Sequence, residues 1–172
     1  MTHCGVHHSA FGDLLIAIKD GYIVRLEFRE PDSAPFLNWC RRYLKELPKP
    51  MESASSEVCE LFNNTVAQLE EYFSGARRMF DLPILLHGTE FQRTVWEELK
   101  KIPYGETCTY RDIANRIGNP KGVRPVGGAN HHNPVSIIVP CHRVIGADGS
   151  LTGYGGGLSL KRALLDLESA AG

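Results

Sequence analysis

The sequence predicts an α/β (α+β) fold in two domains, a sheet-and-helix domain over residues 1–86 and a helical domain over residues 87–172. Two observations support this division. Paired strand-like runs with alternating apolar residues occur near the N-terminus, whereas helical spacing with capping signals dominates the second half. The change falls near His87 and Gly88, where the second domain is expected to begin.

A β-hairpin is predicted over residues 14–28, because the runs LLIAIK and YIVRLEF are split by DG, a dipeptide that suits a type I′ turn. Alternation places one set of apolar residues on a common side of each strand. The two sets are Leu14, Ile16 and Ile18 in the first strand, and Tyr22, Val24, Leu26 and Phe28 in the second.

Helices are predicted over residues 36–44 and 57–73, with a loop between them over residues 47–56. The longer helix is followed by Gly75, and its apolar residues lie close to helical spacing at Val58, Leu61, Phe62, Leu69 and Phe73. Residues 77–86 are expected to return as a strand beside the hairpin.

Two helices of the second domain begin with capping boxes, since Gln92 follows Thr89 by three residues and Asp112 follows Thr109 in the same way. Pro103 closes the first helix, and the tripeptide GNP closes the second. The expected buried stripes are Phe91, Val95, Leu99 and Ile102 in the first helix, and Tyr110, Ile113, Ala114 and Ile117 in the second.

A third helix is predicted over residues 123–131, with Val126 and Ala129 facing inward. Helix, glycine turn and helix form the pattern of a helix-turn-helix, although such pairs also occur as plain packing units. Pro125 fits only if the helix begins late enough to place it in the first turn. A last helix is predicted over residues 159–167, with Leu160, Leu164 and Leu167 inward.

The composition indicates a globular chain, with 42% hydrophobic and 23% charged residues among 172. No apolar run is long enough to span a bilayer and no signal peptide is apparent, so we expect a soluble intracellular protein, cytoplasmic, or nuclear in a eukaryote. Five cysteines without a C-x-x-C pair argue against a disulfide framework or a zinc ribbon. Cys4 with His3, His7 and His8 could form part of a metal site, but solvated terminal histidines are the commoner outcome.

The net charge of −1 is unevenly divided along the chain. Residues 1–87 hold nine Lys and Arg against twelve Asp and Glu, and residues 88–172 hold ten against eight. A basic cluster, opposed only by Asp112, consists of Arg111, Arg116, Lys121, Arg124 and Arg143. A solvated face is the ordinary interpretation, but the overlap with the helix-turn-helix favours a nucleic-acid contact.

The run SIIVPCHRVIG places Cys141 and His142 at the end of an expected buried strand. A nucleophilic cysteine must spend time as thiolate, and a nearby base lowers its pKa from about 8.5. Adjacent residues in extended chain point to opposite sides, so this pair requires a turn after Pro140 or a bridging water. Glu168 could fix the imidazole tautomer. A plain core cysteine is the alternative interpretation.

The run IPYGETCTYRDIANRIGNPKGVRPVGGANHHNPVSIIVPCHRV, followed by GYGGG and a helix that ends in Glu168, resembles the O6-alkylguanine-DNA alkyltransferases, also called methylated-DNA–protein-cysteine methyltransferases. The likeness is nearly gapless from Phe91 to Glu168, and PCHRV is highly specific to that family. The first half resembles the family in outline, as a ribonuclease-H-like domain.

The resemblance implies direct DNA repair in a single turnover, without a cofactor. Cys141 would accept the alkyl group from O6 of a flipped guanine in double-stranded DNA, while His142, oriented by Glu168, would deprotonate the thiol through a water. The thioether would not be cleaved, so the protein would be consumed. A monomer that approaches the minor groove is implied; activity on O4-alkylthymine and cooperativity along DNA are left open.

Other site residues follow from the same resemblance. Tyr110 would lie by the phosphate 3′ of the lesion, and Arg124 would fill the space left by the base, with an ordinary phosphate contact as the alternative. Asn133 would tie the recognition helix to the active-site strand. Further DNA contacts are implied at Lys121, Gly122, Val123 and Asn130. The pocket would comprise the carbonyls of Cys141 and Val144, which accept from the guanine amino group, and the loop of Tyr154, Gly155 and Gly156.

Some positions depart from the family pattern. Lys19 and Ile23 stand where some relatives have zinc ligands, so no structural metal is predicted. Three consecutive glycines from Gly155 indicate a roomy pocket, which suits groups larger than methyl. Ser136 replaces a proline found in some relatives, which argues against high affinity for aromatic O6 substituents.

Three other classes fit parts of the sequence. A damage-binding relative flips bases without transfer but commonly lacks the acceptor cysteine, which Cys141 supplies here. A helix-turn-helix regulator would leave the Cys141–His142 pair unexplained, and a cysteine hydrolase would turn over repeatedly. The damage-binding relative is the main alternative.

Overall fold

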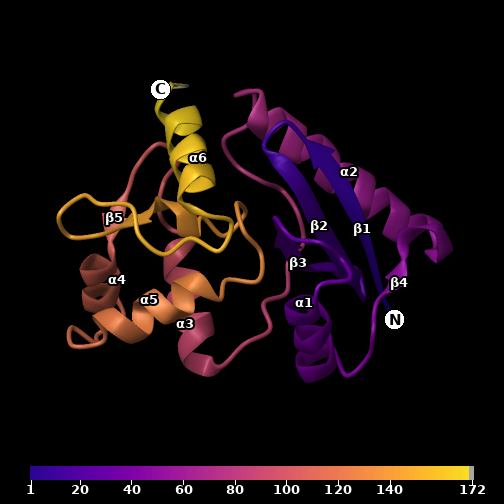
Figure 1. Cartoon of the computed structure of the whole chain (residues 1–172), viewed down its shortest axis with the longest axis horizontal. Coiled ribbons are helices and arrows are strands. Elements are labelled where there is room, and N and C mark those ends of the chain that lie inside the picture. The colour runs from indigo at the N-terminus through magenta and orange to yellow at the C-terminus, as the bar shows by residue number, and fades with distance from the viewer. Residues whose placement is uncertain (171–172) are drawn as a thin grey trace. The chain divides into compact units, whose positions relative to one another are not determined.

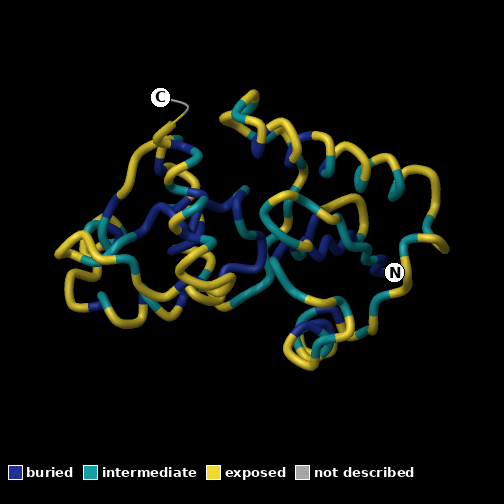
Figure 2. The backbone as a smooth tube through the Cα atoms, turned by 45° about the horizontal axis from the view of Figure 1, so that its top comes forward, coloured by how far each residue is buried: buried dark blue, intermediate teal, exposed yellow. Residues whose placement is uncertain are grey.

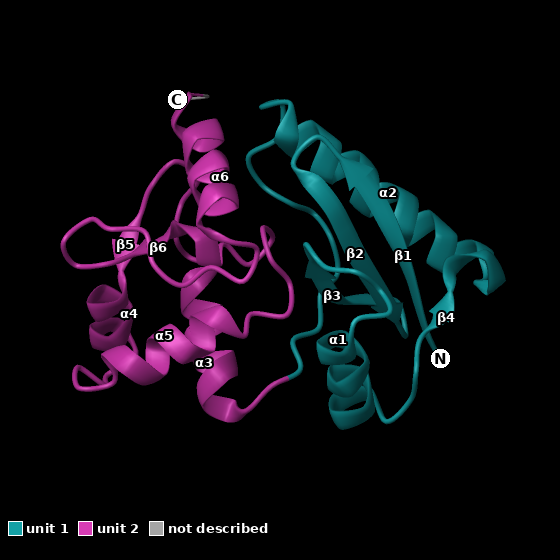
Figure 3. Cartoon of the chain, in the orientation of Figure 1, with its two compact units in different colours: residues 1–87 teal, residues 88–172 magenta. Residues whose placement is uncertain are grey.

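The computed structural model describes residues 1–170. The chain forms two compact units, Met1–His87 and a second that begins at Gly88 (Figures 1 and 3). No helix within residues 1–170 has the length and apolar character needed to cross a membrane. Each unit is built on its own small sheet.

The first unit contains a four-stranded sheet in the order β3-β2-β1-β4. The strands are β1 (Thr2–Ser9), β2 (Gly12–Lys19), β3 (Tyr22–Glu27) and β4 (Lys49–Pro50), antiparallel except for the β1–β4 pair. Asp20 and Gly21 have φ values of 51° and 80°, as a type I′ turn requires, so the predicted hairpin is confirmed. Strand β1 was not predicted, since its polar residues and Gly5 interrupt the apolar alternation.

Helices cover both faces of β2, which is why every residue from Leu14 to Ile18 is fully buried. Helix α2 (Ser56–Phe73) packs closely over β1. A Cβ added to Gly5 would lie 2.9 Å from the Phe62 ring, so glycine is required there. On the other face, α1 (Ala34–Trp39) and the π-helical turn η1 (Cys40–Leu44) form a core of Leu15, Ala17, Val24, Phe36, Cys40 and Leu44.

A β-bulge between β2 and β3 changes the expected side-chain pattern. Ala17 pairs with Arg25 and Ile18 pairs with Ile23, which leaves Val24 as the extra residue. Val24 therefore joins the α1 side of the sheet, while Leu26 is paired with Ile16 and shares its face. The prediction that Val24 and Leu26 share one face is wrong for this reason.

Two segments of the first unit differ from the prediction. Residues 77–86 make only an isolated bridge between Ile23 and Ile84 instead of a strand. Pro83 has no N–H and so cannot extend the ladder, although its carbonyl accepts from the Ile23 N–H at 2.9 Å. The expected loop over residues 47–56 contains β4 and a 3₁₀ turn, η2 (Met51–Ser53).

Within residues 88–170, the second unit contains four α-helices, a short 3₁₀ turn and a two-stranded parallel sheet. The bounds of the helices and strands are α3 (Glu90–Leu99), β5 (Cys108–Thr109), α4 (Tyr110–Arg116), α5 (Val123–His131), β6 (Val144–Ile145) and α6 (Leu158–Ala170). Both predicted capping boxes are present. The Gln92 N–H donates to Thr89 Oγ1 at 3.1 Å, and the Asp112 N–H donates to Thr109 Oγ1 at 3.0 Å. Strand β5 pairs with β6 and leads directly into α4. The first residue of α4 is therefore Tyr110, immediately after the strand.

Helices α4 and α5 form the predicted helix-turn-helix, and α4 ends in a Schellman motif. The Asn119 N–H donates to the Ala114 carbonyl at 2.9 Å around Gly118, whose φ of 75° favours glycine. Helix α5 has the predicted bounds, and Pro125 falls in its first turn. The α5 helix is tied to α3 where the buried Trp96 Nε1–H donates to the Ala129 carbonyl at 2.8 Å.

Helix α6 buries a different set of residues from the one predicted. Leu164 is fully buried, but Leu160 and Leu167 are only half-buried. The other two buried side chains are Lys161 and Glu168, which lie on the same helix face as Leu164. Their hydrogen bonds go to His142 and to the Val144 carbonyl. Residues 133–144 are buried except at Ser136 and Ile138. Figure 2 shows how buried and exposed stretches of backbone alternate along the chain.

We expect Thr109→Ala to lower the unfolding free energy by about 1 kcal/mol, because it removes the side-chain acceptor at the start of α4. Thr94→Ala is the matched control, since Thr94 is exposed in the middle of α3, and its effect should stay within about 0.5 kcal/mol. Urea unfolding of both variants measures the difference. Equal effects would show that the cap of α4 contributes nothing specific.

Candidate active site

The segment that leads to Cys141 folds as two successive γ-turns instead of the expected strand. The Ile138 N–H donates to the Ser136 carbonyl at 2.9 Å around Ile137, and the Cys141 N–H donates to the Val139 carbonyl at 2.8 Å around Pro140. Ile137 has a φ of 73°, which is strained for a β-branched residue, and it is 1% exposed. Close packing therefore holds this loop in a conformation that the chain would not choose alone.

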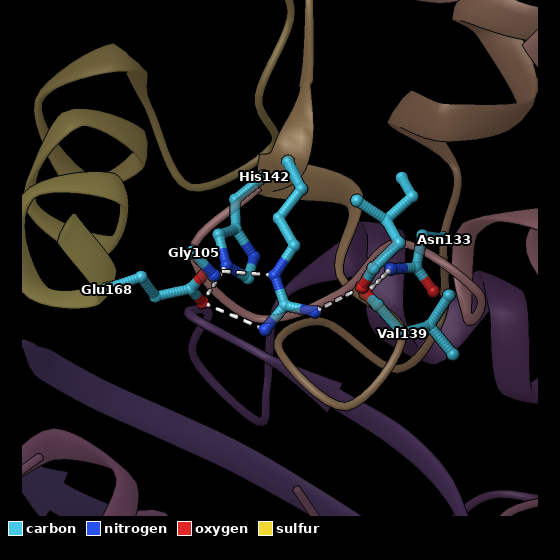
Figure 4. Close-up of polar contacts among 7 residues, drawn as sticks. Gly105, Asn133, Val139, His142 and Glu168 are labelled. Atoms are coloured by element: carbon cyan, nitrogen blue, oxygen red, sulfur yellow. Dashed lines mark hydrogen bonds and ion pairs between the residues drawn. The ribbon is translucent and has the colours of Figure 1, made fainter. Parts of the chain in front are cut away.

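Asn133 fixes the same loop from inside. Its Nδ2–H donates to the Val139 carbonyl at 2.8 Å (Figure 4), and its Oδ1 accepts from the Val135 N–H at 3.1 Å. Asn133 lies two residues beyond the end of α5. The side chain thus joins the end of that helix to the loop that carries Cys141.

Cys141, His142 and Arg143 form a 3₁₀ turn, η3, directly after Pro140. The turn places the imidazole of His142 against Glu168, with Nε2 2.7 Å from Oε2 (Figure 4). A carboxylate can only accept, so Nε2 carries the proton and a neutral ring has Nδ1 as its basic nitrogen. The sequence-based expectation that Glu168 orients His142 agrees with this geometry.

Glu168 is 1% exposed and accepts hydrogen bonds from three residues. Besides His142, Arg143 donates through Nε to Oε1 at 2.8 Å and through Nη2 to Oε2 at 3.1 Å. The Gly105 N–H donates to Oε1 at 3.3 Å (Figure 4). A buried carboxylate is stable only with such compensation, and here it joins α6, η3 and the turn at Gly105.

Arg143 is a site residue that the sequence assigned to the exposed basic cluster. It is 7% exposed, and Nη1 also donates to the Ile102 carbonyl at 2.7 Å. The exposed members of that cluster are Arg111, Arg116, Lys121 and Arg124. The basic face is therefore smaller by one charge than predicted, and that charge serves the interior of the site.

Burial sets the protonation states of Cys141 and His142. Cys141 is 3% exposed, and burial raises the pKa of its thiol, while Asn133, the Lys161 ammonium and Ser136 oppose that rise. Burial lowers the pKa of His142, and the Glu168 carboxylate opposes that fall. The resting site therefore holds a neutral thiol beside a neutral imidazole.

Lys161 is a second buried cation that sequence reasoning missed. Its Nζ donates to the Val144 carbonyl at 2.5 Å and to the Thr152 carbonyl at 2.9 Å. Burial lowers the pKa of this ammonium, and the adjacent Cys141 opposes the fall. The signal was present in the spacing, because Lys161 and Glu168 lie seven residues apart, on one face of a helix.

Tyr110 lies in the same group of contacts. Its hydroxyl donates to the Thr152 carbonyl at 2.9 Å, and the Lys161 Nζ is 5.9 Å from the centre of its ring. The side chain is half-buried at the first position of α4. Tyr110, Lys161 and Val144 are thus connected through shared backbone carbonyls.

The residues predicted to contact DNA near the start of α5 and at Asn130 differ in exposure: some lie at the surface and others are buried. Lys121 and Arg124 are exposed and Val123 is half-buried, so these remain available at the start of α5. Gly122 is buried, and a Cβ there would lie 2.5 Å from Nδ2 of the Asn119 side chain, which would have to shift; its contact with DNA stays a prediction. Asn130 is 2% exposed, so its side chain lies in the interior of the unit in this structure, and its contact with DNA stays a prediction.

Asn130 instead belongs to the interior of the site. Its Nδ2–H donates to the Cys141 carbonyl at 3.3 Å. The same carbonyl accepts from the Val144 N–H, which closes the 3₁₀ turn. Both carbonyls that the resemblance assigned to the guanine amino group, those of Cys141 and Val144, are therefore already hydrogen-bonded within the chain.

The predicted pocket loop combines one buried and two exposed residues. Tyr154 is 8% exposed, and burial raises the pKa of its hydroxyl well above the ordinary value. Gly155 and Gly156 are exposed, and a Cβ on Gly155 would lie 3.9 Å from the His131 carbonyl at the end of α5. The loop thus lies against the C-terminal end of α5.

The N-terminal residues His7 and His8 each form a hydrogen bond with a different carboxylate. His7 Nε2 lies 2.5 Å from a Glu70 carboxylate oxygen, and His8 Nδ1 lies 2.7 Å from one of Asp13. Within residues 1–170, no three His, Cys, Asp or Glu side chains are grouped as metal ligands would be. Burial raises the pKa of the Cys4 thiol.

We expect Arg143→Met to destabilise the protein by about 3–5 kcal/mol, because it leaves the Glu168 carboxylate buried without its bidentate partner. Lys101→Met is the control, since the Lys101–Glu98 pair is largely exposed and should contribute below about 1 kcal/mol. Chemical denaturation measures both effects. Adding Glu168→Gln to Arg143→Met should restore part of the loss, and no restoration would contradict the proposed origin of the effect.

Known proteins resemble this chain along its whole length. Family models of 6-O-methylguanine DNA methyltransferase match residues 2–86, as the ribonuclease-like domain, and residues 90–170, as the DNA-binding domain. A methylated-DNA–protein-cysteine methyltransferase of Mycobacterium leprae is 42% identical over 169 residues, which cover 98% of this chain and 93% of that protein. One of Methanosarcina acetivorans is 58% identical over 111 residues, or 64% of this chain and 71% of that protein.

Solved structures show the same relationship. A crystal structure of the O6-methylguanine methyltransferase of Mycobacterium tuberculosis has a TM-score of 0.84 and 43% identity, covering 100% of this chain and 95% of that one. A structure of the Mycobacterium tuberculosis protein in complex with DNA has a TM-score of 0.82 and 43% identity, covering 98% and 94%. The sequence and the fold both match these proteins, and the chain belongs to the 6-O-methylguanine DNA methyltransferase family.

Proposed function

We propose that this chain repairs alkylated DNA directly, by moving the alkyl group from O6 of guanine in duplex DNA to the Sγ of its own Cys141. The observation that carries the proposal is the buried turn that presents Cys141 beside a His142 held by Glu168. The names of the relatives, methylated-DNA–protein-cysteine methyltransferases, support the same reaction class.

The reaction needs only groups that the site supplies. The Cys141 thiol gives its proton through a water to the basic Nδ1 of His142, and Glu168 stabilises the imidazolium that forms. The thiolate attacks the alkyl carbon, the carbon–O6 bond breaks, and its electron pair stays on O6. The released guanine takes one proton at N1, and no cofactor takes part.

Because the Cys141 thiol is buried, it needs His142 as a general base to become a thiolate. Because burial raises the pKa of Cys141, the thiol does not ionise by itself near neutral pH. The nearby Lys161 ammonium and the Asn133 amide favour the thiolate once the proton has left. The thioether product is stable in water, so the protein is consumed in one turnover.

Contact with DNA is proposed for the exposed start of α5. Lys121 and Arg124 lie there, and a helix-turn-helix is a common DNA-binding unit. The O6 atom of a stacked base cannot reach a buried thiol, so the nucleotide must be rotated out of the duplex. In this proposal a monomer approaches the minor groove, Arg124 fills the vacated space, and Tyr110 lies by the 3′ phosphate.

The pocket loop completes the proposed site. Gly155 and Gly156 carry no side chains that would limit the alkyl group, so groups larger than methyl are proposed as substrates. Tyr154 lines the buried side of the loop. Repair takes place where the DNA is, in the cytoplasm of a prokaryote or the nucleus of a eukaryote.

The acceptor is tested by mass. Mixing the protein with a duplex that carries one O6-methylguanine should add one methyl group per chain, on the peptide that contains Cys141, and restore guanine. Cys141→Ser should abolish the transfer while duplex binding persists, because only the nucleophile is lost. Cys59→Ser, which changes a half-buried cysteine of α2, is the control and should transfer normally.

Two results would contradict this assignment. Methyl transfer that persists in Cys141→Ser would make another cysteine the acceptor. Tight binding of the damaged duplex by the unaltered protein without any gain in mass would make it a damage sensor.

The role of Arg124 is tested by comparing a duplex with a free base. Arg124→Ala should slow transfer from the duplex by about tenfold or more, because filling the stack offsets part of the unstacking energy of a few kcal/mol. Transfer from free O6-methylguanine, which needs no extrusion, should change by less than about twofold. Arg162→Ala, which removes an exposed charge of α6, controls for net charge. Equal losses on both substrates would rule out the extrusion role.

A further inference from the structure

Tyr154 carries a buried hydroxyl that no group within residues 1–170 satisfies. The side chain is 8% exposed, and its hydroxyl oxygen has no hydrogen-bond partner in the part of the chain that the structure describes. An unpaired buried hydroxyl is unusual and costs stability, so a protein retains one when a partner becomes available at another stage of its work. The groups around Tyr154 indicate which partner that is.

Ser136 lies in the loop that leads to Cys141 and is half-buried in a stretch that is otherwise largely buried. Its carbonyl accepts from the Ile138 N–H at 2.9 Å, and its backbone is paired with that of Val139 in an isolated bridge. The Val139 carbonyl in turn accepts from the Cys141 N–H at 2.8 Å. The two γ-turns therefore fold Ser136 back beside the segment that carries the thiol.

The Ser136 hydroxyl is close to both Cys141 and Tyr154. Burial raises the pKa of the Cys141 thiol, and Ser136 is one of the groups that oppose this rise. Burial and the nearby Cys141 raise the pKa of the Tyr154 hydroxyl, and Ser136 again opposes the rise. The Tyr154 hydroxyl thus lies near Ser136, although no hydrogen bond joins the two in the resting site.

The chemistry of these three groups determines the direction of each possible hydrogen bond. A thiolate can only accept, whereas a hydroxyl donates one proton and also accepts. When Cys141 loses its proton, the Ser136 hydroxyl can donate to Sγ, and its oxygen can then accept from Tyr154. A hydrogen bond to an ionised acceptor is stronger than one between neutral groups, so this chain is most stable once the thiolate has formed. The buried hydroxyl of Tyr154 gains its partner in the same step.

We propose that Ser136 is a catalytic residue whose hydroxyl donates to the Cys141 sulfur while its oxygen accepts from the Tyr154 hydroxyl. This inference deepens the proposed function and rests on it, since the thiolate is the form that attacks the alkyl carbon. The proton of Cys141 still passes through a water to His142. Ser136 keeps its own proton and stabilises the charge that is left on the sulfur.

A change at Ser136 leaves the ionisable side chains around the thiol in place, so a changed titration of Cys141 reports the lost hydroxyl. The titratable and charged groups of the surrounding elements are His142 and Arg143 of η3, Tyr110 of α4, Tyr154 of the pocket loop, and Lys161 and Glu168 of α6.

The test measures how fast iodoacetamide alkylates Cys141 as the pH is raised, in the absence of DNA. Mass analysis of the peptide that contains Cys141 separates its alkylation from that of the other cysteines. In Ser136→Ala the rate near neutral pH should fall by about threefold to tenfold, which is the range of one net hydrogen bond. The pH at which alkylation reaches half of its limiting rate should rise, because the thiolate has lost a donor.

Further variants test the connection to Tyr154. Ser136→Thr keeps a hydroxyl and should recover most of the lost rate. Tyr154→Phe removes only the second hydroxyl and should slow alkylation by about twofold. Adding Tyr154→Phe to Ser136→Ala should cause no further loss, because Tyr154 acts only through Ser136. Ser56→Ala, at an exposed position of α2, is the matched control and should leave the rate and its pH dependence unchanged.

Each outcome supports the proposal or overturns it. A loss near neutral pH that recovers at high pH, with no further loss in the double variant, supports it. An unchanged pH dependence in Ser136→Ala, or a loss of equal size at every pH in a variant that melts normally, would overturn it and leave Ser136 as a packing residue. Additive losses in the double variant would overturn the part assigned to Tyr154.

The proposed function fails in a different way. If the alkylation results are as expected but the unaltered protein transfers no methyl group from a duplex with O6-methylguanine, the repair reaction is contradicted. The effect of Ser136 on the thiolate would still stand, because it is measured without DNA.

Discussion

The second unit depends on one buried carboxylate. Glu168, near the end of α6, receives hydrogen bonds from His142, Arg143 and the backbone of Gly105, and Arg143 reaches on to the Ile102 carbonyl. A charge without water is tolerable only when every lone pair has a donor, so these segments must assemble together. The same contacts set the tautomer of His142. The interaction that organises the fold of this unit therefore also leaves Nδ1 of His142 as its basic nitrogen, which is the atom that the proposed mechanism uses.

The site combines strain with electrostatic restraint. Ile137 holds an unfavourable backbone conformation inside a loop that Asn133 ties to the end of α5. Burial keeps Cys141 uncharged although Lys161 lowers the pKa of its thiol, and it keeps His142 uncharged although Glu168 raises the pKa of its imidazole. Charge separation thus waits for a substrate that can complete the proton transfer. The protein thus fixes the positions of Cys141 and His142, and the thiolate forms only when a substrate is bound.

Local signals in the sequence were sufficient for much of the fold. The DG turn, the two threonine capping boxes and the bounds of α5 depend on neighbouring residues alone, and the structure has all of them. The association of His142 with Glu168 followed from the need of an imidazole for an orienting carboxylate. The turn, the caps and the bounds of α5 require no knowledge of tertiary partners, whereas the contact of His142 with Glu168 joins residues 26 positions apart and was expected only from the chemistry of an imidazole.

The remaining features depend on partners far along the chain. Arg143, Lys161 and Asn130 are polar types that usually lie on the surface, and only their contacts with Glu168, Val144 and Cys141 explain their burial. The γ-turns before Cys141 replace a strand because the segment packs as a largely buried loop, and apolar composition cannot distinguish such a loop from a buried strand. The bulge at Val24 likewise escaped a pattern that assumes strict alternation.

The depth of Cys141 also bears on how long the protein lasts before it is used. Peroxides and cellular electrophiles attack thiolates that are accessible to solvent, and this sulfur is 3% exposed with a pKa raised by burial. A protein that is consumed by one reaction must keep its cysteine unmodified in the presence of cellular oxidants until that reaction. Burial therefore protects the Cys141 thiol from these reagents, so that it stays reduced and unmodified until a substrate reaches it.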